Sequence, residues 1–307
     1  MFRRSKFGVF RHFAKRDRWL FFMLLFPVAH VFIFSYIPMY GVLIVFKDYN
    51  AFSGFFKSPW IGFTNFDQVI NDPYFWRVFV NTVRIGALSF LFGFPAPIVL
   101  ALLLNEVSSE KYKKLVQSLT YLPHFISIVV ICGIIVAMLS PSTGLINLIL
   151  KGITGNSIYF MTEPTWFIPI FVISNIWVAT GFGAIIYLAA LSGIDPVLYE
   201  SAVIDGASRW QKAIYITLPG IMPTVVILLI LGMPALISVN FEKVLLLYHP
   251  LTYEVADVIP TYIYRKGLLG GQFSYGATVG FIMSVLSLGI IVLTNYISKK
   301  FSDFSLW

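Results

Sequence analysis

Long apolar runs alternate with short polar segments along the chain, and the length of these runs is its main feature. A helix needs about 20 predominantly apolar residues to cross a bilayer, and six runs meet that length. The pattern predicts an all-α integral membrane protein with six transmembrane helices in one domain, 19–307, after a basic tail at 1–18. The predicted spans cover residues 19–46, 82–104, 115–138, 166–191, 216–239 and 274–298.

The composition agrees with a membrane location. Of the 307 residues, 58% are hydrophobic and only 12% are charged, whereas soluble domains carry about 25% charged residues. The single cysteine, Cys132, lies within an apolar run and can form no internal disulfide. We therefore expect a multi-pass protein whose surroundings include the lipid bilayer.

The positive charge is unevenly distributed along the chain. The formal net charge of +8 could suggest a nucleic-acid partner, but the basic residues cluster at the edges of the apolar runs. Fourteen of the 22 Lys and Arg residues lie on the same side as the amino-terminal tail. Because cytoplasmic segments of membrane proteins are enriched in these residues, we expect both termini and the loop at 192–215 to be cytoplasmic, and no nucleic-acid partner.

One polar loop lies between two apolar runs that carry no charge. Its sequence from Tyr199 to Pro219 is YESAVIDGASRWQKAIYITLP. Apolar and small residues recur at helical spacing on both sides of Gly206, and glycine permits a sharp change of direction. The segment predicts two short helices with a bend, lying along the membrane face. We expect Asp205 to cap the second helix by accepting its free backbone N–H groups.

This loop resembles the EAA loop of ABC importer permeases, which reads E-A-A, two residues, D-G-A, and later I-x-L-P. In that family the loop is a coupling helix that docks into a cleft on a cytoplasmic ATPase. Ser201 replaces the usual alanine, and Ala213 stands where an aromatic residue is common. The alternative is an ordinary amphipathic cytoplasmic loop. The matching positions are Glu200, Ser201, Ala202, Asp205, Gly206, Ala207, Ile216, Leu218 and Pro219.

The resemblance implies a type I ABC importer permease, in which six spans form half of a pore in a bacterial cell membrane. It also implies a second homologous permease, two cytoplasmic ATPase subunits and an extracytoplasmic solute-binding protein. ATP and Mg²⁺ would bind to the ATPase subunits, and this chain would hold no cofactor. Glu200 would pair with a basic residue of the ATPase cleft, because a charge-assisted contact is strong and directional.

A second resemblance concerns the cargo. The stretch Ser35–Asn50, SYIPMYGVLIVFKDYN, resembles the start of permeases for oligosaccharides and polysaccharide fragments. Such cargo is held by hydrogen bonds from neutral polar groups and by aromatic stacking. Asn175 could equally form a hydrogen bond to a neighbouring helix, and Arg265 and Lys266 would suit an acidic sugar. The substrate-binding candidates are Asn175, Trp177, Tyr187 and Asn240.

Several motifs are absent from the sequence, and these absences bear on the class of protein. There is no G-x-x-x-x-G-K-[ST] phosphate loop, no H-E-x-x-H, and no His and Cys cluster with metal-ligand spacing. We therefore expect a transport subunit rather than an enzyme, with no catalytic residue and no metal site. The central parts of the predicted spans carry no charge, which counts against ion coupling. The alternatives are an ABC importer permease for a non-sugar solute and an ion-coupled secondary carrier.

Overall fold

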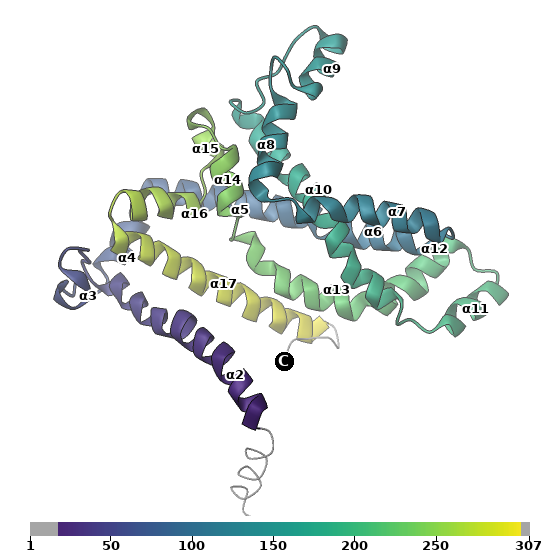
Figure 1. The fold of residues 1–307 in the computed structure, drawn as a ribbon, viewed down its shortest axis with the longest axis horizontal. Helices are drawn as coiled ribbons and strands as arrows, with labels where there is room; N and C mark the ends of the chain where they lie inside the picture. The colour runs from purple at the N-terminus through teal and green to yellow at the C-terminus, as the bar shows by residue number, and fades with distance from the viewer. Residues whose placement is uncertain (1–17, 302–307) are drawn as a thin grey trace, which may run out of the picture.

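The computed structural model describes residues 18–301, which are almost entirely helical (Figure 1). Within that range the only β-type pairing is an isolated bridge between Lys47 and Trp60. The predicted tail at 1–18 lies outside the described residues except for Arg18. The longer helices are α2 (Arg18–Val31), η2 (Ile37–Phe46), α5 (Pro73–Gly93), α6 (Pro95–Asn105), α7 (Glu110–Tyr121), α8 (Ile128–Leu139), α9 (Leu145–Thr154), α10 (Pro164–Leu191), α13 (Leu218–Gly232) and α17 (Phe273–Phe301).

Five continuous helical runs of the described chain are long and apolar enough to cross a membrane, and one bent pair of helices would supply a sixth crossing. Each of them overlaps one predicted span. The all-α architecture is therefore confirmed, whereas the membrane boundaries of the spans stay predictions. The runs are Trp19–Phe46, Pro73–Asn105, Pro164–Leu191, Arg209–Leu236 and Phe273–Lys300, and the bent pair is Glu110–Phe125 with Ile128–Leu139.

The second run begins at Pro73 rather than at the predicted Thr82. Asp72 accepts a hydrogen bond from the backbone N–H of Tyr74 at 2.9 Å, and Pro73 occupies the first helical position. Both features are typical of a helix start. The apolar pattern misses these turns because polar residues such as Asn81 interrupt it.

The helix over the predicted third span, 115–138, is broken. The helix formed by α7 and the short turn η3 (Leu122–Phe125) meets α8 at an angle of 102°. Pro123 has no N–H to donate to a continuous helix. Ser127 is extended, and its hydroxyl accepts a hydrogen bond from the Val130 N–H at 3.4 Å, which begins a new helix. As a result, α8 and α9 project away from the other long helices (Figure 1).

The two long segments that follow the third and fifth predicted spans contain short helices. Segment 139–165 includes α9, and segment 240–273 includes a series of helices that begins with α14 packed against α8. Hydropathy misses these helices because each is shorter than a membrane span. The series comprises α14 (Phe241–Leu247), the 3-10 helix η6 (Pro250–Thr252), α15 (Tyr253–Ala256), α16 (Ile259–Tyr262) and the π-helix η7 (Ile263–Leu269).

Close backbone contacts fix two of the helix crossings. A Cβ atom on Gly86 of α5 would lie 2.3 Å from the carbonyl oxygen of Leu236, and one on Gly181 of α10 would lie 2.0 Å from the carbonyl oxygen of Thr120. Small residues at such crossings let backbones approach. Helix α10 contacts α5, α6, α7 and α13 and therefore occupies the centre of the described fold.

The two ends of the long axis carry different elements (Figure 1). Helices α11 (Pro196–Ile204) and α12 (Arg209–Lys212) lie at one end, and α3 (Gly54–Lys57) and α4 (Thr64–Ile70) lie at the other. Most of the long helices run between these ends, whereas α8 and α9 project away from them. The polar loop at 192–215 is therefore far from α3 and α4.

Candidate functional site

The loop at 192–215 contains a short helix, α11, that stands out from the packed helices. It begins at Pro196, after Asp195, whose carboxylate accepts a hydrogen bond from the Val197 N–H at 3.0 Å. None of the residues of α11 is buried, and Glu200 is exposed on it. The next residue, Ser201, donates its hydroxyl proton to the Val197 carbonyl oxygen at 2.9 Å. The Glu200 carboxylate is thus available to another protein.

A left-handed glycine ends α11 and turns the chain. Gly206 has a φ of 75°, a conformation that glycine adopts without the strain of a side chain. The Gly206 N–H donates to the Val203 carbonyl oxygen at 3.1 Å, and the Ala207 N–H donates to the Ala202 carbonyl oxygen at 2.8 Å. This pair of bonds is the Schellman helix ending. The bend predicted at Gly206 is confirmed.

The prediction that Asp205 caps the second helix is wrong, because Ser208 caps it. The Ser208 hydroxyl accepts a hydrogen bond from the Gln211 N–H at 3.3 Å, and the Gln211 side chain accepts one from the Ser208 N–H at 2.7 Å. This reciprocal arrangement is a capping box. Asp205 instead follows Ile204, the last residue of α11, in the C-cap position.

The second short helix is the start of the fifth run rather than a separate element. Helix α12 continues through the π-helix η4 (Ala213–Thr217) into α13, so that Arg209–Leu236 forms one helical run. Leu218 packs beside the buried cluster that holds Ile221, and Pro219 lies in the first turn of α13. The I-x-L-P part of the motif therefore joins the loop to a long helix.

Asn175, the first substrate-binding candidate, contacts a buried lysine. Its side-chain oxygen accepts a hydrogen bond from the Lys243 Nζ at 2.5 Å, and the Phe171 carbonyl oxygen accepts another at 3.2 Å. Lys243 is 1% exposed, and no described carboxylate forms an ion pair with it. Burial lowers the pKa of Lys243 to about 8, because desolvation disfavours the charged form. Asn175 thus links α10 to α14.

The other three substrate candidates lie in different surroundings. Asn240 caps α14, since its side-chain oxygen accepts a hydrogen bond from the Lys243 N–H at 2.9 Å. Tyr187 is buried in a separate cluster between α6, α10 and α13. Trp177 lines a cavity on another side of α10. The structure therefore brings Asn175 and Asn240 to the same lysine and leaves Tyr187 and Trp177 apart from them.

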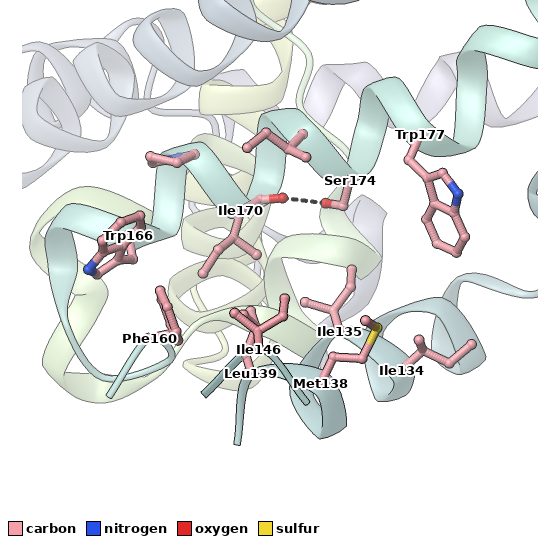
Figure 2. A pocket seen from close by; sticks show the side chains of 12 residues that line it. Ile134, Ile135, Met138, Leu139, Ile146, Phe160, Trp166, Ile170, Ser174 and Trp177 are labelled. Atoms are coloured by element: carbon pink, nitrogen blue, oxygen red, sulfur yellow. Dashed lines mark hydrogen bonds between the residues drawn. The ribbon is translucent and has the colours of Figure 1, made fainter. Parts of the chain in front are cut away.

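The pocket beside Trp177 measures about 610 Å³ and is lined by residues of α8, α9 and α10 and by Phe160 (Figure 2). Its one hydroxyl, that of Ser174, donates to the Ile170 carbonyl oxygen of its own helix at 2.5 Å. The rest of the lining is aliphatic or aromatic, including Trp166 and Met138. A carbohydrate site needs several converging hydrogen-bonding groups, so this cavity is poorly suited to a sugar.

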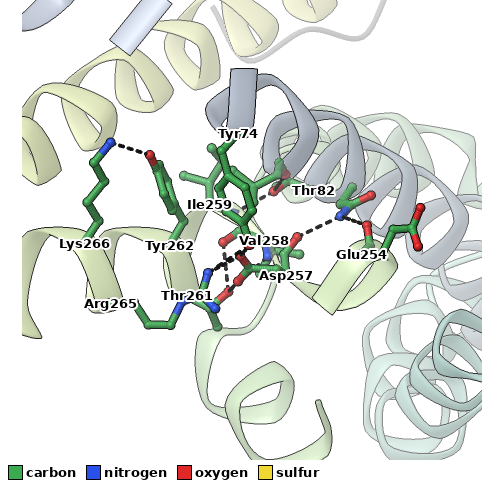
Figure 3. Close-up of polar contacts among 12 residues, drawn as sticks. Tyr74, Thr82, Glu254, Asp257, Val258, Ile259, Thr261, Tyr262, Arg265 and Lys266 are labelled. Carbon is green, nitrogen blue, oxygen red and sulfur yellow. Dashed lines mark hydrogen bonds and ion pairs between the residues drawn. The ribbon is translucent and has the colours of Figure 1, made fainter. Parts of the chain in front are cut away.

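Arg265, one of the two basic candidates for an acidic sugar, is tied to a buried carboxylate (Figure 3). It forms an ion pair with Asp257, which is 0% exposed at its side chain. Asp257 also accepts hydrogen bonds from the hydroxyls of Tyr74 at 2.6 Å and Thr261 at 2.7 Å. The charge of Arg265 is therefore balanced within the fold, where it fastens η7 to the start of α5.

Lys266, the second basic candidate, is paired with Asp72 at 2.7 Å. The hydroxyls of Tyr262 and Tyr275 donate to the same carboxylate at 2.6 and 2.8 Å. Partial burial raises the pKa of Asp72, but the hydrogen bonds from Lys266 and the two tyrosines outweigh it and hold this pKa well below its usual range. Asp72 thus joins α16, η7 and α17 to the start of α5, the helix that it caps.

Comparison with known proteins identifies the chain by family. Residues 93–303 match the family model described as a binding-protein-dependent transport system inner membrane component. The chain belongs to this family of ABC importer permeases. The permease is a multi-pass transport subunit of the inner membrane and not an enzyme, and in homologous systems separate ATPase subunits hydrolyse ATP.

Individual relatives resemble the permease along most of its length. It is 42% identical to "Protein LplB" of Bacillus subtilis (strain 168), over 94% of its own chain and 91% of that protein. It is 39% identical to the "Polygalacturonan/rhamnogalacturonan transport system permease protein YteP" of the same organism, over 94% and 90%. A crystal structure of a bacterial alginate ABC transporter, in complex with its alginate pentasaccharide-bound periplasmic protein, superposes with a TM-score of 0.88 at 45% identity, over 95% of the permease and 98% of that chain.

Proposed function

We propose that this permease moves oligosaccharides or polysaccharide fragments into a bacterial cell, after an extracytoplasmic protein has delivered them. The observation that carries the proposal is similarity over nearly the whole chain to proteins whose names give polygalacturonan, rhamnogalacturonan and alginate as cargo. Alginate is an acidic polysaccharide. Since Arg265 and Lys266 already pair with carboxylates, a sugar carboxylate would meet other groups.

The cargo is tested by ATP hydrolysis in lipid vesicles that contain the complete transporter and its binding protein. The panel holds galacturonate oligosaccharides, alginate oligosaccharides, neutral arabinose oligosaccharides and glycerol phosphate. We expect one saccharide class to stimulate hydrolysis several-fold over the protein without ligand. If the intact complex responded to no saccharide, or only to glycerol phosphate, the carbohydrate assignment would be wrong.

The same proposal gives α11 the role of coupling helix. Two ATPase subunits, which bind ATP and Mg²⁺, would dock on the cytoplasmic face of this permease and of a second, homologous permease. The exposure of Glu200 and the Schellman turn after Ala202 support a rigid, projecting helix of this kind. The coupling residues are Glu200, Ser201, Ala202, Asp205, Gly206, Ala207, Leu218 and Pro219.

Charge reversal at Glu200 tests the docking role. We expect Glu200→Lys to insert normally but to lose more than tenfold in uptake, because breaking a buried charge pair at an interface costs about 2 kcal/mol or more and each 1.4 kcal/mol is about tenfold. Glu110→Lys, at an exposed glutamate in the first turn of α7, is the matched control. Normal uptake by Glu200→Lys would refute docking through this residue.

For the substrate path, we propose the region where Asn175 and Asn240 meet Lys243, with Trp177 and Tyr187 as further candidates. Asn175 of α10 contacts the Lys243 ammonium group, and Asn240 contacts the backbone N–H of the same lysine at the start of α14. Asn175→Ala separates a sugar contact from a structural one. A raised KM for uptake with an unchanged melting temperature would support substrate binding, whereas a lowered melting temperature with an unchanged KM would leave only the helix-to-helix role.

A further inference from the structure

The coupling helix α11 is attached to the fifth helical run by two neighbouring contacts. The Tyr199 hydroxyl lies 3.0 Å from the Thr217 hydroxyl. One turn further along, Ile194 occupies the space that a side chain on Gly220 would need, since a Cβ there would lie 2.7 Å from the Ile194 Cδ1. Thr217 and Gly220 are three residues apart and share one helix face. The loop therefore rests on a single face at the start of α13.

The direction of the hydrogen bonds is set by the single proton of the threonine hydroxyl. Thr217 donates to the Lys212 carbonyl oxygen at 3.2 Å. A hydroxyl has one proton to donate, so Tyr199 must be the donor in the other bond. The result is a relay from Tyr199 through Thr217 to Lys212. Because Thr217 is 2% exposed, water competes little for this bond.

The relay ends in a non-standard turn of the fifth run. Lys212 precedes Thr217 by five residues, and five residues is the hydrogen-bond spacing of a π-helix. The π-helix η4, Ala213–Thr217, lies between α12 and α13. Among the described residues, the Tyr199 bond is the one side-chain hydrogen bond that joins α11 to another helix. Within the described part of the chain, the Tyr199 hydrogen bond is therefore the one polar contact through which a movement of α11 can act on a neighbouring long helical run.

We propose that Tyr199 and Thr217 are positioning residues that make α11 and α13 move as one unit during transport. The inference rests on the proposed docking of an ATPase on α11. Glu200, which would contact the ATPase, is the chain neighbour of Tyr199. A displacement of α11 would therefore move the Tyr199 side chain, the buried Thr217 hydroxyl to which it is hydrogen-bonded, and the π-helix η4 that contains Thr217. With the apolar Ile194 contact alone, α11 would be free to pivot about its first residues.

The first experiment measures the distance between α11 and α13 in the complete transporter. Spin labels are placed at Val197→Cys and Leu231→Cys, two positions that are 59% and 57% exposed, in a Cys132→Ser background. In the parent protein the distance should be the same without nucleotide and with ATP and vanadate. In Tyr199→Phe and Thr217→Val it should change between the two states, whereas it should not change in Thr217→Ser, which keeps the hydroxyl.

The second experiment measures uptake per ATP hydrolysed, with the most effective saccharide of the panel. Loss of one hydrogen bond of ordinary strength shifts an equilibrium roughly 2- to 12-fold, so we expect Tyr199→Phe to lower the ratio by about 5-fold. Tyr199→Phe combined with Thr217→Val should be no worse than either variant alone. Tyr215→Phe, on an exposed tyrosine of the same π-helix, is the matched control and should match the parent protein.

The outcomes separate this inference from the docking proposal. If Glu200→Lys uncouples transport while Tyr199→Phe and Thr217→Val behave as the parent protein in both experiments, the positioning role is refuted and docking stands. If the two variants lose their ATPase subunits on purification, the residues act in assembly and the inference is also refuted. If Glu200→Lys transports normally, the docking proposal itself fails.

Discussion

At the scale of single residues, Lys243 shows how the permease holds a charge among apolar side chains. Its ammonium group donates to the Phe171 carbonyl and the Asn175 amide oxygen, and it lies 4.7 Å from the centre of the Phe171 ring. These contacts offset part of the cost of desolvation. Because no described carboxylate pairs with this cation, part of the desolvation cost is not offset, and it lowers the stability of the folded state.

We expect the stability of the permease to rise as the pH increases from about 8 to about 10.5. The folded-state pKa of Lys243 is lowered to about 8 from 10.5. Between these values the unfolded chain binds more protons than the folded chain, so folding becomes more favourable as the pH rises, by at most about 3 kcal/mol. The measurement is the melting temperature in detergent from pH 7.5 to 9.5.

Lys243→Met is the reference for that measurement, because methionine has a similar length and does not titrate. At pH 7.5 the Met variant should melt at or above the temperature of the parent protein, and this advantage should shrink as the pH rises. An advantage that stayed constant across the range would show that Lys243 is not held as a desolvated cation.

Residue roles differ in how far the sequence can predict them. The bend at Gly206 is predictable, since a left-handed turn after a helix favours glycine. The cap at Ser208 is also encoded, because serine followed three residues later by glutamine is a capping-box pattern, yet the neighbouring Asp205 is an equally plausible cap from residue type alone. The burial of Lys243 is not predictable, because it depends on how α14 packs against α8 and α10.

At the scale of elements, glycine crossings determine how closely the long helices approach. We expect Gly86→Ala to lower the melting temperature by several degrees, because its Cβ would lie 2.3 Å from the Leu236 carbonyl oxygen and backbone cannot move aside cheaply. Gly93→Ala, in the same helix with no atom within 4 Å of its added Cβ, should be neutral or slightly stabilising, since alanine favours helix. Equal effects of the two changes would contradict the close crossing.

Helix boundaries are predictable where hydropathy and caps agree, as at α10, Pro164–Leu191, whose ends lie within two residues of the ends of the predicted span 166–191. Boundary predictions fail where a long helix carries polar residues that form tertiary contacts. The amide of Asn81, for example, donates to the carbonyl oxygens of Glu254 and Asp257. The break between α7 and α8 also escapes hydropathy, because both halves remain apolar enough for one span.

At the scale of the whole molecule, we expect α11 and the α9 segment to lie on opposite sides of the membrane. In a Cys132→Ser background, an impermeant maleimide should label Asn156→Cys in intact cells and Lys111→Cys only after permeabilisation. Both positions are exposed, so access depends on the membrane alone. Labelling of Lys111→Cys in intact cells would reverse the proposed orientation, with both termini outside the cytoplasm.

The number and order of the long runs follow from the sequence, because bilayer thickness fixes the length that an apolar run must have. The spatial arrangement of these runs does not follow from the sequence. The pairing of Asp72 and Asp257 with Lys266 and Arg265 joins residues nearly 200 positions apart in one case and eight in the other. Such pairs decide which charges are free for a ligand, and they become visible only in the folded chain.

The first run, Trp19–Phe46, has no buried residue within its most apolar stretch. Helices in a bilayer associate through packing, because lipid already satisfies their apolar surface. Helix α2, at the start of this run, therefore gains little from its own chain after insertion, whereas η2 packs against α17. The consequence concerns biogenesis. Synthesised without the proposed partner subunits, the polypeptide should be degraded by membrane proteases, and co-expression with a second permease and the ATPase subunits should restore its yield.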